Sequence, residues 1–141
     1  MYDLFIYILS FVFIITIPVF LHELGHFIAA KSVGIKVEKF YIGFNLFGLG
    51  IKKKFRGTEY GIGLFPLGGY VKVSGIIDES LDNNSEKESK NLEIKKSDPS
   101  SEFRNKNTFQ KLWFLSAGVI MNFLLTIIIY FFTFYSSGIV E

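Results

Sequence analysis

Two histidines and a glutamate near the N-terminus have the spacing of a zinc-protease site. The stretch HELGHF begins at His22 and contains Glu23 and His26. On a helix, His22 and His26 lie about 6 Å apart along the axis and on one face, so both imidazoles can reach one cation. A tetrahedral Zn²⁺ with two histidines and one further protein ligand keeps its fourth position for water, and lowers the pKa of that water to roughly 7. Glu23, next to the histidines, is the candidate base for the proton of that water.

The surroundings of this pattern argue against a chance match. HExxH fixes only three positions, and on the helix of a soluble protein an exposed His-Glu pair needs no explanation. Here the pattern lies inside an apolar run from Leu4 to Ala30. Ionisable groups within lipid are costly and usually mark a functional site. The position of the pattern therefore favours a metal site.

The composition indicates a membrane protein. Half of the 141 residues are hydrophobic, and 18% are aromatic. Two stretches, Leu4 to Leu21 and Leu112 to Tyr135, carry no charge and are long enough to cross a bilayer. A signal peptide is the alternative for the first, but Met1 to Asp3 has no basic residue, and the run exceeds the roughly 7 to 15 apolar residues of a signal peptide. We predict two retained spans. Since the chain has no cysteine, thiolate ligands and disulfides are excluded.

The distribution of charge predicts the orientation. All 15 Lys and Arg residues lie between Lys31 and Lys111, where ten acidic residues leave an excess of 15 − 10 = +5. By the positive-inside rule, the loop 31–111 is cytoplasmic, faces anionic lipids, and leaves both termini outside the cytoplasm. With Asp3 at the outer boundary, His22 lies about 28 Å along the helix axis, towards the cytoplasmic side of a core about 30 Å thick.

The fold class that we predict is a mainly α membrane protein with two transmembrane helices and a small membrane-associated antiparallel β-loop between them. The β-loop rests on four short runs rich in glycine and aromatic residues. These runs are Val37–Phe47, Gly50–Phe55, Thr58–Phe65 and Gly69–Ser74. Their apolar character suggests a sheet that dips into the membrane beside the metal helix. An unpaired edge of this sheet could bind an extended substrate strand, whereas the alternative is a sheet that only plugs the helix bundle.

Five segments follow from these patterns. They are a first transmembrane helix with the zinc motif (1–30), a re-entrant β-loop region (31–77), a polar cytoplasmic linker (78–102), an interfacial lead-in with the second transmembrane helix (103–135), and a short non-cytoplasmic tail (136–141). In the second span, Ser116-Ala117-Gly118 is a small surface against which another helix could pack. Asn122 is the only amide side chain of this span; it either faces the metal site or makes an ordinary interhelical hydrogen bond.

Several stretches, spread over most of the chain, resemble the site-2 protease family of intramembrane zinc metalloproteases, and specifically its bacterial RseP-like branch. HELGHF matches the first-helix motif of that family. The segments GTEY from Gly57 and FPLGGYVK from Phe65 are similar to its re-entrant β-loop, and the longer of the two is more specific than HExxH. FRNK from Phe103 and AGVIMNF from Ala117 resemble the start and core of its second span.

The resemblance implies zinc as the cofactor, His22 and His26 as its ligands, and Glu23 as the catalytic base. It also implies a β-loop that presents an extended substrate near the metal, and there the candidate substrate-binding residues are Gly43, Phe44, Asn45, Gly68 and Gly69. Family members cut transmembrane segments of other membrane proteins, often anti-sigma factors, and some clear signal-peptide remnants. We therefore expect a multi-pass protein of the bacterial inner membrane, with membrane proteins and lipids as partners and no nucleic acid.

This chain departs from the pattern of the family in three places. The family has a third zinc ligand, an aspartate on a later helix that follows one or more PDZ domains, and no residue up to Glu141 matches it. Asn45 replaces the last glycine of a turn, although Asn also tolerates positive φ, and Val119 replaces a proline. We expect a C-terminal part with a PDZ domain to complete the site. The alternative is a truncated, catalytically incomplete protein that binds membrane segments or partners without hydrolysing them.

Overall fold

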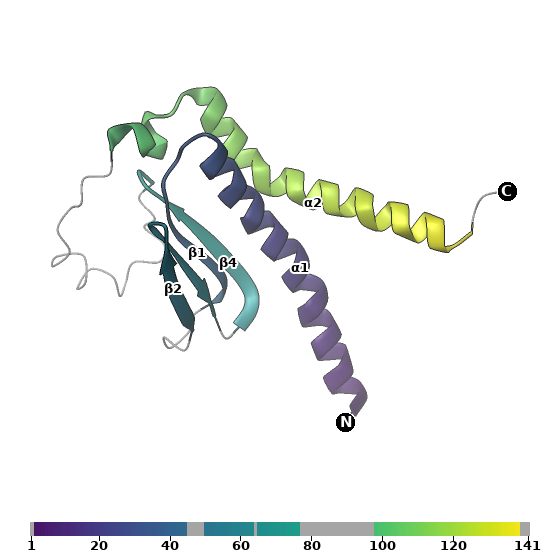
Figure 1. Ribbon diagram of the computed structural model, residues 1–141. Helices are drawn as coiled ribbons and strands as arrows, with labels where there is room; N and C mark the ends of the chain where they lie inside the picture. The colour runs from purple at the N-terminus through teal and green to yellow at the C-terminus, as the bar shows by residue number, and fades with distance from the viewer. Residues whose placement is uncertain (1, 45–49, 64, 77–97, 139–141) are drawn as a thin grey trace.

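Two long helices flank the chain, and a four-stranded sheet lies between them in sequence (Figure 1). The computed structural model describes residues 2–44, 50–63, 65–76 and 98–138. The helices are α1, Tyr2–Ser32, and α2, Thr108–Ser136. Both are long and apolar enough to cross a membrane, judged by length and composition. α1 continues 11 residues beyond the charge-free stretch that ends at Leu21, and α2 begins four residues before the stretch that starts at Leu112.

The ends of the helices that meet the sheet are fixed by local signals. Gly34, with φ +66°, follows α1. The Gly34 N–H donates to the carbonyl of Lys31 and the Ile35 N–H to that of Ala30, which is the Schellman arrangement that ends a helix. At the start of α2, the Asn107 side chain accepts from the Gln110 N–H, and the Gln110 side chain accepts in return from the Asn107 N–H.

The sheet consists of β1 (Val37–Phe44), β2 (Ile51–Phe55), β3 (Thr58–Ile62) and β4 (Phe65–Val73). Its strand order is β2-β3-β1-β4. The predicted antiparallel sheet is confirmed in part, because β1–β4 and β2–β3 are antiparallel, whereas β1 and β3 are parallel. β4 also begins four residues before the predicted run from Gly69, and it forms one edge of the sheet.

Contacts beneath α1 account for the parallel pairing. Phe40 of β1 lies opposite Tyr60 of β3, and the Phe27 ring of α1 contacts both, with centroids 5.1 and 5.9 Å away. The buried Thr58 hydroxyl donates to the carbonyl of Val37 at 2.8 Å. β2 and β3 form a hairpin through Arg56 and Gly57, both with positive φ, as two-residue hairpin turns require. The aromatic cluster and the buried hydroxyl hold β3 beside β1, and this leaves β2 at the outer edge.

The hydrophobic core lies where α1 ends, α2 begins and β4 ends. Its residues are Ala30, Ile35, Val37, Val73 and Phe114, with Phe27, Val33, Val71, Ile76 and Phe103 packed around them. From this junction the two helices diverge, with the sheet and α2 on different sides of α1 (Figure 1). The large apolar side chains towards the far ends of both helices, such as Phe5 and Phe131, are exposed. The predicted lead-in to α2 is part of the junction, because the Phe103 N–H donates to the carbonyl of Ser74 at 2.8 Å. Most of the predicted polar linker 78–102 lies outside the described residues, because residues 77–97 are not described.

Candidate metal centre

His22 and His26 project from the same face of α1 towards α2. Their Nε2 atoms are 3.2 Å apart, and their rings meet edge to face with centroids 4.8 Å apart. Helical spacing brings the rings together, as the HExxH pattern predicts. Two nitrogen ligands on one tetrahedral zinc, at roughly 2.0–2.1 Å each, would be about 3.3 Å apart. The observed spacing of the Nε2 atoms fits a pair of ligands for one zinc ion.

The second helix contacts the far nitrogen of each ring. The Nδ1 atom of His26 donates to the backbone carbonyl of Phe114 at 2.8 Å. Since a carbonyl can only accept, the proton of a neutral His26 lies on Nδ1, and Nε2 keeps a free lone pair. The side-chain Nδ2 of Asn122 lies 3.4 Å from Nδ1 of His22. Asn122 thus contacts His22 from the second helix, and this contact is compatible with both alternatives for the residue.

Two glycines allow this close approach of the helices. A Cβ added to Gly25 would lie 2.5 Å from the carbonyl oxygen of Ala117. A Cβ added to Gly118 would lie 2.6 Å from Nε2 of both His22 and His26. The missing side chain of Gly118 therefore leaves open the volume next to both Nε2 atoms. The small surface predicted on α2 is confirmed for Ala117 and Gly118, which are buried, while Ser116 is half-buried.

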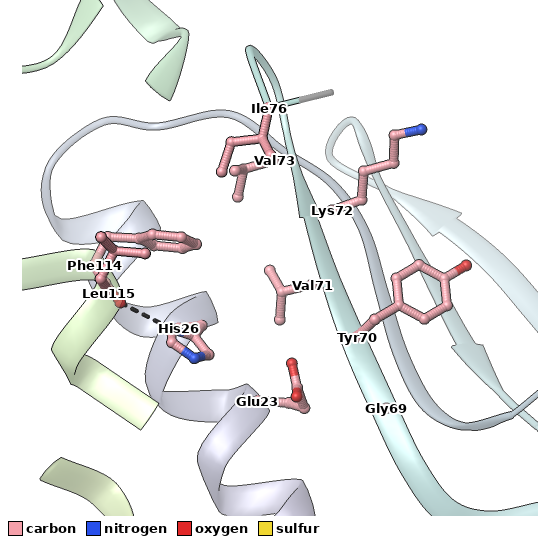
Figure 2. Close-up of a pocket in the computed structure, with 10 residues that line it drawn as sticks. All are labelled: Glu23, His26, Gly69, Tyr70, Val71, Lys72, Val73, Ile76, Phe114 and Leu115. Atoms are coloured by element: carbon pink, nitrogen blue, oxygen red, sulfur yellow. Dashed lines mark hydrogen bonds between the residues drawn. The ribbon is translucent and has the colours of Figure 1, made fainter. Parts of the chain in front are cut away.

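Beside the histidines is a pocket of about 290 Å³ between α1, β4 and the start of α2 (Figure 2). Glu23 and His26 line it from α1, and Phe114 and Leu115 line it from α2. Val71 and Val73 point towards the helices, whereas Tyr70 and Lys72 point away from them. The remaining lining residues are Gly69 and Ile76. Glu23 thus lies between the metal-ligand candidates and an edge strand of the sheet.

Of the predicted substrate-binding residues that the structure describes, Gly69 lines this pocket. A Cβ on Gly69 would lie 3.1 Å from Cγ of Glu23 and 2.7 Å from the carbonyl oxygen of Tyr41, so glycine permits the close contact of β4 with α1. Gly43 has φ +78° and lies where the pairing of β1 with β4 shifts register. Gly68 lies on β4 outside the pocket lining. Phe44 ends β1, and Asn45 lies outside the described residues.

Within the described residues, no group of three or more His, Cys, Asp or Glu side chains could hold a metal ion. Two histidines with one fixed tautomer and an open volume between their Nε2 atoms nevertheless fit part of a zinc site. The described part of the chain supplies two ligands and an adjacent carboxylate.

A second polar group lies on the face of the sheet away from α1. Tyr41 of β1 and Tyr70 of β4 stack with their ring planes 3° apart and their centroids 5.0 Å apart. The Tyr41 hydroxyl donates to the carboxylate of Glu59 on β3, and the ring covers Gly61, where a Cβ would collide with it. Burial raises the pKa of Tyr41, and the hydrogen bond and charge of Glu59 raise it further. Burial and the Glu59 charge also raise the pKa of Tyr70.

Sequence reasoning missed the contributions of Phe114 and Gly118 to the centre. Phe114 acts through its backbone carbonyl, which every residue has, so its side chain gave no signal. Gly118 was recognised as a packing residue, and its position between the histidines depends on the register of α1 against α2. That register follows from the glycine contacts, which require the three-dimensional structure.

Comparison with known proteins supports the interpretation of this geometry. The profile of peptidase family M50 matches residues 10–140. A Helicobacter pylori protein named "Putative zinc metalloprotease" is 42% identical over 118 residues, which cover 81% of this chain and 29% of the relative. A Chlamydia trachomatis protein with the same name is 36% identical, over 85% of this chain and 18% of the relative. A Clostridium acetobutylicum protein, again named "Putative zinc metalloprotease", is 40% identical over 121 residues, which cover 86% of this chain and 30% of the relative. The chain thus spans less than a third of the length of each of these relatives.

Proposed function

Because this chain belongs to peptidase family M50, the site-2 protease family, we propose that it is the N-terminal catalytic part of an intramembrane zinc metalloprotease. The observation that carries this proposal is the 3.2 Å approach of the two Nε2 atoms. It is joined by Glu23, which lines the adjacent pocket together with strand β4. Relatives named as zinc metalloproteases support zinc as the metal.

In this proposal His22 and His26 hold zinc through Nε2, and Glu23 is the general base. Zinc, when bound, supplies a Lewis acid that activates water and polarises a peptide carbonyl. Glu23 takes the proton of the attacking water and delivers it to the leaving amine, so that one carboxylate serves both halves of peptide hydrolysis. The pocket lies next to Glu23 and His26, which is where the peptide bond must be placed.

We propose transmembrane segments of other membrane proteins as substrates, such as those of anti-sigma factors or signal-peptide remnants. A transmembrane helix must unwind locally before its backbone can reach the centre. β4 is an edge strand that runs past Glu23, and main-chain hydrogen bonds from such an edge can hold an extended segment. Gly69 keeps this strand close to the carboxylate.

We further propose that the protein lies in the bacterial inner membrane, with α1 and α2 spanning it, the loop 31–111 in the cytoplasm and lipids around the exposed apolar residues. Family M50 is membrane-embedded, and the apolar surfaces of the two helices support this placement. The third zinc ligand would come from a complementing C-terminal part with a PDZ domain. The short coverage of the relatives, between 18% and 30% in the three compared above, is consistent with such a part.

Zinc content and a chimera test this proposal. We expect the purified chain to bind zinc, and His22→Ala to lose it. To measure activity, the segment of this chain that matches the Helicobacter pylori relative is inserted into that relative in place of its own segment. The rest of the relative then supplies the parts of the enzyme that lie outside the match. This chimera should cleave a transmembrane substrate, and Glu23→Gln should reduce the rate about 10²- to 10⁴-fold, the usual contribution of a general base, while zinc stays bound.

The unaltered relative is the control for folding and for the substrate. If the chimera carries stoichiometric zinc and cleaves equally well with Glu23→Gln, the assignment of the base is overturned. If it carries zinc but does not cleave while the relative does, the non-hydrolytic alternative is supported instead.

A further inference from the structure

The polar contacts around the two histidines form one chain that ends in an unsatisfied atom. Oδ1 of Asn122 is buried and has no hydrogen-bond partner among the described residues, although Nδ2 of the same amide lies 3.4 Å from Nδ1 of His22. A buried acceptor without a partner costs about 1–3 kcal/mol. This cost at the edge of a candidate metal centre calls for a functional explanation.

With the amide in this orientation, the amide and the two rings form one hydrogen-bond chain. An amide nitrogen can only donate, so Nδ1 of His22 accepts, and neutral His22 carries its proton on Nε2. That proton then points to Nε2 of His26, 3.2 Å away, which has a free lone pair because Nδ1 of His26 donates to Phe114. Every nitrogen of the two rings is satisfied, but His22 is in the tautomer that cannot bind a metal through Nε2.

We propose that Asn122 is a positioning residue for the metal, and that its amide turns by half a rotation between the metal-free and the metal-bound centre. This inference rests on the proposed zinc function. After the rotation, the orphaned Oδ1 accepts a proton from Nδ1 of His22. Both Nε2 atoms then present lone pairs to the volume that Gly118 leaves open. The two lone pairs repel each other unless a cation lies between them, so metal binding and the amide rotation favour each other.

The same helix thus orients both ligands. α2 supplies the carbonyl of Phe114 to His26 and the amide of Asn122 to His22. The carbonyl is a permanent acceptor, and it fixes the His26 tautomer with or without metal. The amide offers either a donor or an acceptor, so His22 is the ligand whose tautomer changes. Outer contacts of this kind typically contribute 10- to 100-fold to metal affinity.

The test compares zinc affinity in three forms of the purified chain, measured by competition with a chelator. Asn122→Leu keeps the size of the side chain and removes both the donor and the acceptor, and we expect it to bind zinc 10- to 100-fold more weakly. Asn122→Asp keeps an acceptor and loses the donor, and it should stay within about 10-fold of the unaltered chain. Thr133→Val, at an exposed position further along α2, is the control and should change nothing.

A spectroscopic measurement separates positioning from a structural role. Nitrogen NMR of the imidazoles should show His22 protonated on Nε2 without metal and on Nδ1 with zinc, while His26 stays protonated on Nδ1 in both states. In Asn122→Asp, metal-free His22 should already be protonated on Nδ1. The cobalt-substituted spectrum should be the same in the unaltered chain and in Asn122→Asp, which excludes direct ligation by the new carboxylate.

The outcomes distinguish this inference from the proposed function. If Asn122→Leu binds zinc as tightly as the unaltered chain, or Asn122→Asp binds as weakly as Asn122→Leu, the positioning role is overturned and the zinc site stands. If the unaltered chain binds no zinc, the zinc assignment fails, and this inference fails with it.

Discussion

Tyr41 is a tyrosine whose neutral form is stabilised in the folded chain. Its hydroxyl donates to Glu59, its ring stacks on Tyr70, and the side chain is buried. Burial, followed by the hydrogen bond and the charge of Glu59, raises the pKa of the Tyr41 phenol. A raised pKa in the folded state means that the folded chain holds this proton more tightly than the unfolded chain does. The contribution to stability is therefore complete below the ordinary tyrosine pKa of about 10 and is lost as pH rises through the higher folded value.

We expect Tyr41 to remain protonated at a pH where exposed tyrosines have already ionised. The difference in phenolate absorbance between the unaltered chain and Tyr41→Phe isolates this residue among the seven tyrosines. Glu59→Gln removes the neighbouring charge and should move the Tyr41 transition to lower pH, but burial should keep it above that of an exposed phenol such as Tyr2. A Tyr41 transition that coincides with that of exposed tyrosines would contradict the contact with Glu59.

At the scale of elements, α1 and α2 meet through glycines. The backbone of α2 at Ala117 packs directly against Gly25, and the two imidazoles of α1 pack directly against Gly118. Each glycine therefore lies opposite a group of the other helix that cannot easily move, namely a main-chain carbonyl in one case and the ring pair in the other. The separation of the helices at the centre is set by these two contacts.

Gly118→Ala tests this contact at the metal centre. The added methyl group would lie 2.6 Å from both Nε2 atoms, so the helices or the rings must shift. Overpacking of this kind costs about 1–3 kcal/mol, which corresponds to roughly 5- to 100-fold weaker zinc binding if the rings move. Chelator competition measures the affinity, and circular dichroism checks that helix content is retained. Ser116→Ala, whose hydroxyl donates to carbonyls of α2 itself, is the matched control, and an unchanged zinc affinity in Gly118→Ala would show that the open volume is not used by the metal.

The elements differ in how far the sequence could predict them. The charge-free runs from Leu4 and from Leu112 predicted both helices, because lipid-facing helices need continuous apolar residues. The histidine pair was predictable because helical spacing alone brings the rings together. The parallel pairing of β1 with β3 was not predictable, since it depends on Phe27 packing against Phe40 and Tyr60 from separate elements. The direction of Asn122 likewise required the register between two helices that are distant in sequence.

At the scale of the whole molecule, the helix ends and the outer sheet edge differ in charge. The far ends of α1 and α2 expose large apolar side chains, while β2 exposes Lys52, Lys53 and Lys54 between the exposed Ile51 and Phe55. The apolar helix ends and the basic sheet edge support the proposal that the helices lie in lipid and the sheet edge at a cytoplasmic, anionic surface.

Cysteine labelling in vesicles tests the orientation, because the chain has no native cysteine to interfere. Lys52→Cys and Ser137→Cys each place one thiol at an exposed position. In right-side-out vesicles, a membrane-impermeant maleimide should label Ser137→Cys and leave Lys52→Cys unlabelled. Inverted vesicles should give the opposite result, and detergent should expose both. Labelling of Lys52→Cys from the outer side would reverse the orientation.

The contacts at His22 and His26 also determine when during synthesis the centre can form. The residues that orient the two rings, Asn122 and Phe114, lie 100 and 88 positions further along the chain. At translation rates of about 5–20 residues per second, the first helix waits on the order of 5–20 s for these partners. Throughout that interval the nascent chain has the HExxH motif but not the second helix that sets its tautomers.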